Sequence, residues 1–159
     1  MSQDIAEQVI GRFVQTWNAH DVEAFANCFK SDGTFVNVLA REARGRRAIA
    51  GMHKFPFARV QAKAIMSVQR VELRSLTDRL VGADVWWKVR GSTNPLGMPV
   101  GDRDGYMYCV IDTADGTGSI IATRNLDQTD SYGRGLGGVL SRIEEREENH
   151  EALCVDLLT

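Results

Sequence analysis

Two helices that lead directly into a β-strand are the feature of this sequence that most restricts its fold. Apolar side chains recur at every fourth position from Ile5 to Trp17. This spacing is typical of an amphipathic helix, which we expect over residues 3–17. Asn18 tolerates the left-handed backbone with which helices end, and Asp21 is a good N-cap for a second helix. One face of this helical pair must be buried against the rest of the chain.

The second helix is expected to be short and to give way to the first strand. Its inward-facing residues are expected to be Val22, Phe25, Ala26 and Phe29. The run Ser31-Asp32-Gly33 favours a turn that ends this helix, and the β-rich residues 34–39 follow as a strand.

The remaining residues up to about 130 are predicted to form one more helix and then long strands. The helix covers residues 45–57, with Ile49 and Met52 inward and an end near Pro56. Four β-like segments follow, at residues 64–75, 79–90, 103–113 and 118–128. The connection at 91–101, GSTNPLGMPVG, is long enough to overhang a cavity mouth. Helices followed by a curved, mostly antiparallel sheet predict an α+β fold in which the sheet wraps the helices and leaves a pocket.

Several motifs together carry a family resemblance. The segment WNAHDVEAFANCFKSDGTFVN is followed by a Gly45-Arg46 helix start, an aromatic strand around Trp86-Trp87 and a closing strand with IIATRN. The chain therefore resembles the cone-shaped nuclear transport factor 2-like superfamily, within it the SnoaL-like group, and specifically the SgcJ/EcaC family of enediyne and other natural-product genes. The resemblance covers residues 5–129 and implies a cystatin-like fold. It implies no single activity, because this fold carries isomerases, dehydratases, cyclases, epoxide hydrolases and association domains.

Composition predicts one domain with neither a nucleic-acid nor a membrane partner. The chain has 159 residues, of which 43% are hydrophobic, which is enough for a single core. With 19 basic and 21 acidic residues, the net charge of -2 gives no long-range attraction to a polyanion. The sequence has no apolar run of membrane-spanning length and no secretory signal, so we expect a cytoplasmic protein.

The domain is placed at residues 1–130, and residues 131–159 are expected to form a Gly-rich linker and a tail with a short helix. The run GRGLGG in this linker superficially matches a phosphate-binding loop, but it does not open a strand-helix-strand unit. The arginines of REARGRR, at 41, 44, 46 and 47, favour a solvated loop and helix start over a phosphate contact.

The cysteines and the absent motifs predict a protein without a metal or a cofactor. Cys28, Cys109 and Cys154 lie far apart and lack CxxC spacing, so we expect reduced cysteines in apolar positions. The sequence contains no nicotinamide or flavin fingerprint.

The strand at 79–90 is predicted to have two different faces. One face carries Val81, Ala83, Val85, Trp87 and Val89, and the other carries Leu80, Asp84, Trp86, Lys88 and Arg90. Because each face has a tryptophan, the face away from the helices requires a cover, which in the resembling superfamily is the sheet of another subunit. We therefore expect a homodimer.

The resemblance also identifies two positions where catalytic groups are missing. In the steroid-isomerase branch of the superfamily, a tyrosine polarises a carbonyl and a carboxylate moves a proton. The corresponding positions here are Phe13 and Asn37, neither of which supports acid/base catalysis. Steroid-isomerase chemistry is therefore not expected. Asn37 either binds a ligand from the pocket or satisfies nearby backbone groups.

Few titratable residues remain as candidates. His53, one turn after Ile49, is either a proton donor or acceptor or a partly buried structural residue. His20 is expected to be exposed in the turn between the helices, and His150 in the charged tail receives no role. Three histidines so scattered give no visible set of metal ligands.

A further set of candidates comes from the strands. Asp104 follows Arg103 at the start of one strand, and Arg124 lies on the last strand before Asn125 and Asp127. If Asp104 and Arg124 meet near the pocket mouth, they orient a polar ligand; otherwise they form surface ion pairs. The aromatic residues that either line the cavity or pack in the core and dimer are Trp17, Trp86, Trp87, Tyr106 and Tyr108.

Two functional hypotheses follow. The first is a small cofactor-independent enzyme, a lyase, isomerase or cyclase, that encloses an apolar polyketide- or polyene-like molecule and uses His53, Asn37 and Asp104 in proton transfer. The second is a non-catalytic binding or accessory protein that acts with a partner enzyme. An association domain with a filled interior is a third possibility. A cavity in which His53 and a carboxylate converge would favour the first hypothesis.

Overall fold

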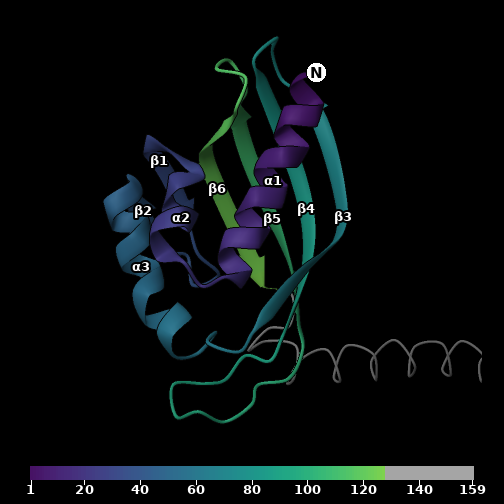
Figure 1. The fold of residues 1–159 in the computed structure, drawn as a ribbon. Coiled ribbons are helices and arrows are strands. Elements are labelled where there is room, and N and C mark those ends of the chain that lie inside the picture. Colours follow the sequence, from purple (N-terminus) through teal and green to yellow (C-terminus); the bar gives the residue numbers. More distant parts are fainter. Residues whose placement is uncertain (128–159) are drawn as a thin grey trace, which may run out of the picture. The chain divides into compact units, whose positions relative to one another are not determined.

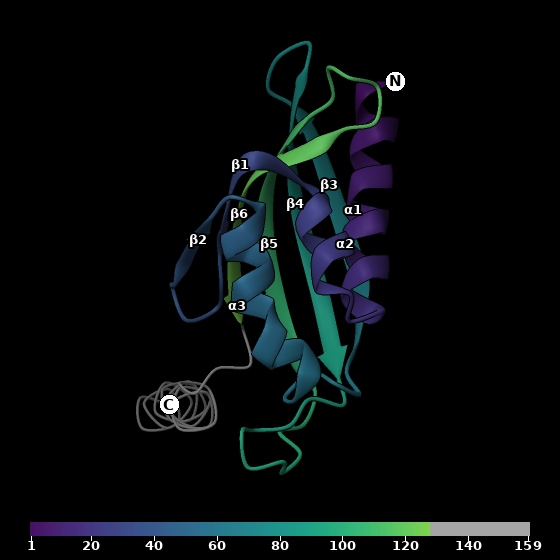
Figure 2. The same ribbon diagram turned by 60° about the vertical axis from the view of Figure 1, so that its left-hand side comes forward.

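The computed structural model describes residues 1–127, and these form a six-stranded sheet with three helices on one face (Figures 1 and 2). The helices are α1 (Ser2–Asn18), α2 (Val22–Asn27) and α3 (Arg46–Ala58). The strands are β1 (Phe29–Val36), β2 (Glu42–Arg44), β3 (Ile65–Ser75), β4 (Leu80–Arg90), β5 (Arg103–Asp112) and β6 (Ser119–Asp127). The predicted α+β architecture is confirmed. The expected linker and tail helix lie outside the described residues.

The sheet has the order β2-β1-β6-β5-β4-β3. All neighbouring strands are antiparallel except β1 and β6, which pair in parallel. The four long strands start and end within one residue of their predicted limits. This agreement arises from period-two alternation, which is clearest in β4 and β5, where alternate side chains are buried.

The first helix ends for a different reason from the one expected. Asn18 is still helical, and its side chain accepts a hydrogen bond from Met66 N at 2.7 Å and donates one to Met66 O at 3.0 Å. The left-handed residue is His20, with φ of 53°. The expectation that His20 is exposed is wrong, because its ring is half-buried between Trp17 and Phe57, with centroids 5.9 and 5.7 Å away.

The boundary between α2 and β1 also differs from the prediction. The helix ends at Asn27, and Phe29 already pairs with Ile120 in β6. The Ser31-Asp32-Gly33 run, predicted to be a turn, lies inside the strand, where the pairing register shifts between Phe29 and Thr34. These residues therefore form a bulge in the strand rather than a turn, because β1 pairs with β6 on both sides of them.

The turn after β1 ends that strand earlier than expected, and it leads into a strand that was not predicted. The β1 strand stops at Val36 rather than Leu39, and the three-residue β2 pairs with it through Thr34–Arg44 and two further pairs. A strand this short carries too little alternation to be recognised in sequence. The third helix was predicted closely, with Gly45 at its N-cap and Pro56 inside its last turn.

The hydrophobic core lies between the helices and the concave face of the sheet. The predicted faces of β4 are confirmed: Val81, Ala83, Val85, Trp87 and Val89 are buried, while the five residues predicted for the opposite face are half-buried or exposed. Gly105 lies directly opposite Trp87 on β5, and a Cβ atom there would approach the indole to 1.9 Å. The absent side chain of Gly105 therefore provides the space that the indole ring occupies.

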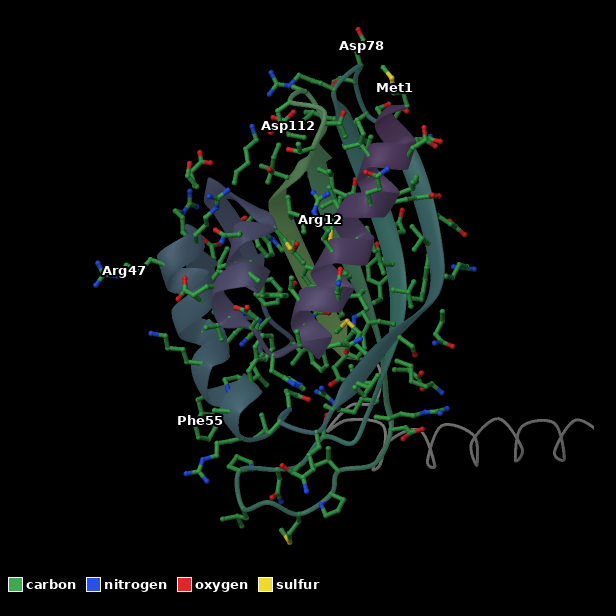
Figure 3. All side chains as sticks on the ribbon, in the orientation of Figure 1. Met1, Arg12, Arg47, Phe55, Asp78 and Asp112 are labelled. Carbon is green, nitrogen blue, oxygen red and sulfur yellow. The ribbon has the colours of Figure 1, made fainter. Side chains whose placement is uncertain are left out.

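The buried carboxylate of Asp112 links several elements at the end of the sheet far from α3 (Figure 3). Its side chain is 2% exposed and forms ion pairs with Arg79 and Lys30, both at 2.5 Å. The hydrogen bonds from Arg79 and Lys30 hold the pKa of Asp112 well below its usual range. This network joins β1, β5 and the turn before β4.

Candidate functional site

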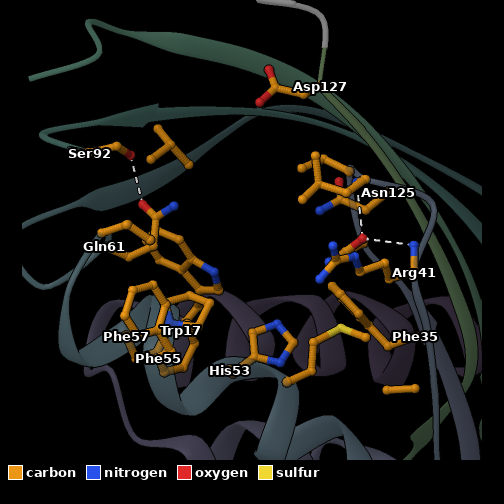
Figure 4. A pocket seen from close by; sticks show the side chains of 18 of the residues that line it. Trp17, Phe35, Arg41, His53, Phe55, Phe57, Gln61, Ser92, Asn125 and Asp127 are labelled. Atoms are coloured by element: carbon orange, nitrogen blue, oxygen red, sulfur yellow. Dashed lines mark hydrogen bonds between the residues drawn. The ribbon is translucent and has the colours of Figure 1, made fainter. Parts of the chain in front are cut away.

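A pocket of about 1040 Å³ opens at the end of the domain where α3, the turn after β1 and the 91–101 loop come together. Figure 4 looks into it, with His53 on α3 below and Asn125 and Asp127 of β6 above. The expectation that the 91–101 loop reaches the pocket is confirmed, because Ser92, Thr93, Pro95 and Val100 line it. The interior is therefore open. The third hypothesis, an association domain, requires an interior filled by side chains, which is not what the structure shows.

Aromatic side chains form the floor of the pocket. Phe13 and Trp17 come from α1, Phe35 from β1, and Phe57 from α3. The Trp17 ring packs edge-on against Phe57 with centroids 5.8 Å apart, and both side chains are under 10% exposed. Residues that approach from three elements and lock one another give a rigid, apolar surface suited to a flat ligand.

His53 faces the pocket from this floor (Figure 4). Its Nδ1 lies 2.8 Å from the carbonyl oxygen of Ile49, which can only accept a hydrogen bond, so Nδ1 carries the proton and Nε2 has the free lone pair. Burial among the rings of Phe25, Phe35 and Phe57 lowers the pKa of His53, against a smaller opposing effect of the Ile49 carbonyl. The imidazole is thus neutral at physiological pH and presents a hydrogen-bond acceptor to the cavity.

A polar wall of four residues lies at the ends of β4, β5 and β6. We define it as Trp87, Arg103, Asn125 and Asp127, all of which line the pocket. The indole Nε1 donates to Asn125 Oδ1 at 2.9 Å, which leaves the amide nitrogen of Asn125 as a donor. Arg103 Nη1 lies 3.0 Å from Asp127 Oδ2, with the two side chains only 20% and 17% exposed.

This wall offers mainly donors to a ligand. The Arg103 guanidinium also lies 6.0 Å from the centre of the Trp87 ring, and its Nε is buried without a hydrogen-bond partner among the described residues. A ligand oxygen is the complement of such a surface, because guanidinium and amide nitrogens donate but do not accept.

The Asn37 side chain serves the backbone at the pocket rim. Its Oδ1 accepts from Leu39 N at 3.0 Å and from Arg41 N at 2.9 Å. Two roles were considered for Asn37, and its side-chain oxygen has the second: it accepts hydrogen bonds from nearby backbone N–H groups. The residue nevertheless also lines the pocket. Across the mouth, Ser92 donates to Gln61 at 2.7 Å and ties the 91–101 loop to the segment after α3.

Five of the sequence candidates do not belong to the pocket lining. They are Asp104, Trp86, Tyr106, Tyr108 and Arg124. Asp104 forms an ion pair with Lys88 at 3.3 Å, on the face of the sheet away from the helices. Arg124 lies opposite Tyr108, four positions from Asp104 along β5, which corresponds to about 13 Å. Asp104 and Arg124 therefore do not meet at the mouth.

Three of the four residues of the polar wall were not selected as site candidates from the sequence; only Trp87 was. Arg103 and Asn125 each stand next to a chosen candidate, and Asp127 lies three positions after Arg124; all three point to the opposite side of the sheet from those candidates. The available signal was strand parity, because they share odd positions with the buried Met107 and Thr123.

Neither a metal cluster nor a membrane-spanning helix is found in the described part of the chain. Within residues 1–127, no group of three or more His, Cys, Asp and Glu side chains is arranged to hold a metal ion. The helices of the same segment are too short or too polar to cross a bilayer. Cys28 and Cys109 are buried and unpaired, as expected, and Cys154 lies outside the described residues.

The fold matches solved structures whose functions are diverse or unknown. An uncharacterised cystatin-like protein from Caulobacter vibrioides has a TM-score of 0.74 and 20% identity, over 84% of this chain and 94% of its own. A ketosteroid isomerase-like protein from Erwinia carotovora atroseptica has a TM-score of 0.65 and 16% identity, over 79% and 95%. A putative calcium/calmodulin-dependent protein kinase II association domain from Xanthomonas campestris has a TM-score of 0.64 and 15% identity, over 76% and 84%. These similarities concern the fold alone.

At the level of sequence, no curated protein matches the chain significantly. The family model of the SnoaL-like domain matches residues 10–113, which extend from the aromatic floor of the pocket through most of the sheet. The finer SgcJ/EcaC assignment stays a prediction. The chain belongs to the SnoaL-like domain family.

Proposed function

We propose that this protein binds an apolar small molecule of the polyketide or polyene type and acts on it in natural-product biosynthesis. The observation that carries the proposal is an open cavity of about 1040 Å³ whose floor is aromatic and whose polar groups are confined to one wall and His53. Cavities of this size and composition enclose drug-sized ligands. A conjugated or fused-ring skeleton fits the floor, and an oxygen substituent fits the donors of the polar wall.

His53 is the residue on which a lyase, isomerase or cyclase activity rests. Its neutral Nε2 accepts a proton from a C–H bond next to a ligand carbonyl, and the enolate that forms faces the donors of Arg103 and Asn125. The proton then returns from Nε2 to another carbon of the same skeleton, so the net reaction is an isomerisation. No cofactor enters this reaction. The earlier role considered for Asp104 is not part of the proposal, since its observed partner is Lys88.

A non-catalytic role is the alternative, and one observation favours it. The positions that hold the tyrosine and the carboxylate in the steroid-isomerase branch are occupied by Phe13 and Asn37, and the Asn37 oxygen is committed to backbone donors. Without those groups, the same pocket shelters a ligand for a biosynthetic partner enzyme. Both roles require the ligand, and only the first requires proton transfer by His53.

Ligand binding is tested by tryptophan fluorescence with a hydroxyanthraquinone and a linear polyene acid as probes. Trp17 and Trp87 line the pocket, whereas Trp86 lies on the other face of the sheet. Saturable quenching is expected, with a smaller amplitude in W17F and W87F. In the control W86F the quenched fraction rises, because an emitter outside the pocket has been removed. No quenching by either probe, or equal quenching in all three variants, contradicts the proposed ligand site.

Proton transfer is tested by deuterium exchange into a polycyclic ketone in D2O. The wild-type protein is expected to accelerate exchange next to the carbonyl, and H53Q is expected to lose the acceleration while it still binds the ketone. If the wild-type protein binds the ketone without exchange, the sheltering role replaces the catalytic one. If H53Q exchanges as fast as wild type, His53 is not the base.

The homodimer also belongs to this proposal. The outer face of the sheet carries Trp86 and Tyr106 with ring centroids 5.3 Å apart, and Arg70 lies 3.5 Å over the Trp86 ring. Tyr106 donates to Asp84 at 2.5 Å, which raises the pKa of Tyr106 to about 12 and fixes its ring. A rigid aromatic platform of this kind suits contact with a second copy. Light scattering is expected to give a dimer mass for wild type and a monomer mass for W86E, and a wild-type monomer excludes this interface.

A further inference from the structure

Two turns of the same construction frame the pocket mouth. The first is Asn37–Arg41 and the second is Asn94–Met98. In each, the asparagine Oδ1 accepts from the backbone N–H groups two and four residues later, at 2.9 to 3.0 Å. In each, the residue three positions later has a left-handed backbone and donates to the asparagine carbonyl at 2.9 Å: Ala40 with φ of 57° and Gly97 with φ of 83°.

Both turns present a leucine to solvent at the same position. Leu39 is 69% exposed and Leu96 is 84% exposed, and each follows its asparagine by two residues. Ala40 accepts a left-handed conformation that costs a residue with a Cβ about 1 kcal/mol. These apolar side chains are held outward by well-bonded turns, and several of them gathered around one opening are the kind of surface that marks an interaction site.

Further apolar side chains surround the same opening. Phe55 on α3 is 56% exposed and lines the pocket, and Met98 in the second turn is 54% exposed. Figure 3 places Phe55 at the end of the domain opposite to Asp78 and Asp112. We call Leu39, Phe55, Leu96 and Met98 the apolar rim.

The region around the apolar rim is strongly cationic, although the whole chain has a net charge of -2. Between Glu42 and Glu72 the sequence has no acidic residue and seven basic ones, namely Arg44, Arg46, Arg47, Lys54, Arg59, Lys63 and Arg70. Six of them lie on α3 or within a few residues of it, and all six are exposed. Arg41, Glu42 and Arg44 line the pocket itself, and Glu42 pairs with Arg44 at 3.2 Å, so the cationic excess there comes from Arg41 and from the arginines and lysines of α3 and its flanks. Figure 3 shows Arg47 pointing away from the molecule.

We infer that the pocket mouth docks on an anionic lipid surface, with the apolar rim inserted among the acyl chains and the arginines on the headgroups. Separate protruding tips insert into a bilayer boundary, whereas a rigid protein partner requires a flatter, continuous surface. Clustered cations beside exposed apolar side chains are the charge pattern that anionic membranes attract. This contact is peripheral, so it does not conflict with the lack of a spanning helix in residues 1–127.

This docking gives the proposed ligand a route. An apolar molecule dissolves in the bilayer rather than in water, and the mouth opens within the surface that would contact the lipid. The surface contact itself does not depend on the ligand, so it is testable without one.

The test is flotation of the full-length protein with phosphatidylcholine vesicles that contain or lack phosphatidylglycerol. Wild type is expected to float only with the anionic vesicles, and less at high salt. The double variant R41Q/R44Q is expected to bind more than tenfold more weakly, because each arginine contributes about fivefold. The double variant L39S/L96S is expected to lose binding even at low salt.

Matched controls lie at the far end of the domain. Leu76 is 45% exposed and Arg74 has a 72% exposed side chain, so L76S and R74Q are expected to float as wild type does. Circular dichroism establishes that every variant is folded. Absence of flotation with anionic vesicles at low salt, or equal losses in the rim and control variants, overturns the inference. Binding to soluble polyglutamate that L39S/L96S retains, with no flotation, assigns the cationic surface to an acidic protein instead and also overturns it.

Discussion

Gly105→Ala tests the packing that creates the polar wall. The added Cβ would lie 1.9 Å from Cζ2 of Trp87 and 2.3 and 2.4 Å from two more ring atoms. Ordinary contact begins at about 3.4 Å, so the indole has to move by about 1.5 Å. Trp87 is 2% exposed, and its ring cannot move without displacing core neighbours or the strand.

The expected cost follows from two contributions. Overpacking of a filled core costs about 1–3 kcal/mol, and displacement of the indole also breaks the Nε1 hydrogen bond to Asn125, which is worth about 1 kcal/mol. The free energy of unfolding of G105A should therefore fall by about 2–4 kcal/mol. Quenching by the pocket probes should weaken as well, because Trp87 no longer forms the wall.

Gly82→Ala is the matched control in the neighbouring strand. Its added Cβ would meet Tyr108 Oη at 2.4 Å, and this hydroxyl is the far end of a half-buried side chain on the outer face of the sheet rather than part of the core. We expect G82A to change the free energy of unfolding by less than about 1 kcal/mol. Urea unfolding followed by far-UV circular dichroism measures both variants without relying on tryptophan. Equal stabilities of G105A and G82A would show that the indole does not occupy the space beside Gly105.

Three further predictions concern stability. Burial lowers the pKa of His53, so protons bind the unfolded chain more readily and wild-type stability should fall as the pH drops below about 6.5, by at most about 1.4 kcal/mol per pH unit. H53Q should lose this part of the slope in urea titrations at several pH values, and an unchanged slope would assign it to another group. The free energy of unfolding of D112N should be about 2–4 kcal/mol lower than that of wild type at neutral pH, because Arg79 and Lys30 lose their buried carboxylate. Since the pKa of Asp112 is lowered in the folded protein, this difference should shrink as the pH falls below about 4. A difference independent of pH would refute the ion-pair account. G51A in α3, where an added Cβ meets open space, should raise the free energy of unfolding by about 0.5–1 kcal/mol in the same titrations, and a loss would mean that this helix surface is covered.

The sequence was sufficient to predict the layers, the helices and the long strands. Helix α1 and strand β4 each bury one face, so apolar residues recur every 3.6 positions in α1 and every second position in β4. Both periods are visible in the sequence itself. The bulge in β1 was not predictable in the same way. Ser31-Asp32-Gly33 carries a turn signal, and only pairing with the distant β6 keeps these residues in a strand.

The candidate site was predictable on the helical side and less so on the sheet. Phe13, Trp17 and His53 line the pocket as expected, because a helix face that turns inward near a sheet must border the interior. On β5 and β6 the choice favoured Asp104 and Arg124, since a carboxylate and a guanidinium suggest chemistry. The strand geometry places Asp104 and Arg124 outside the pocket, because their neighbours in the alternating pattern are the residues that face the helices.

Strand parity explains why the polar groups of the pocket stand where they do. Met107, Cys109 and Ile111 fill the inner face of β5 in its middle, where any polar side chain would be buried without water. Arg103 continues the same parity at the strand end, where the helices no longer cover the sheet, and Asn125 and Asp127 do so on β6. Charged inward side chains of β5 and β6 therefore stand at the open end, where Arg103 pairs with Asp127 and Asn125 accepts from Trp87 while all of them line the pocket. In a cone of this kind, inward-parity polar residues at the strand ends are stronger site candidates than acidic residues chosen for their chemistry alone.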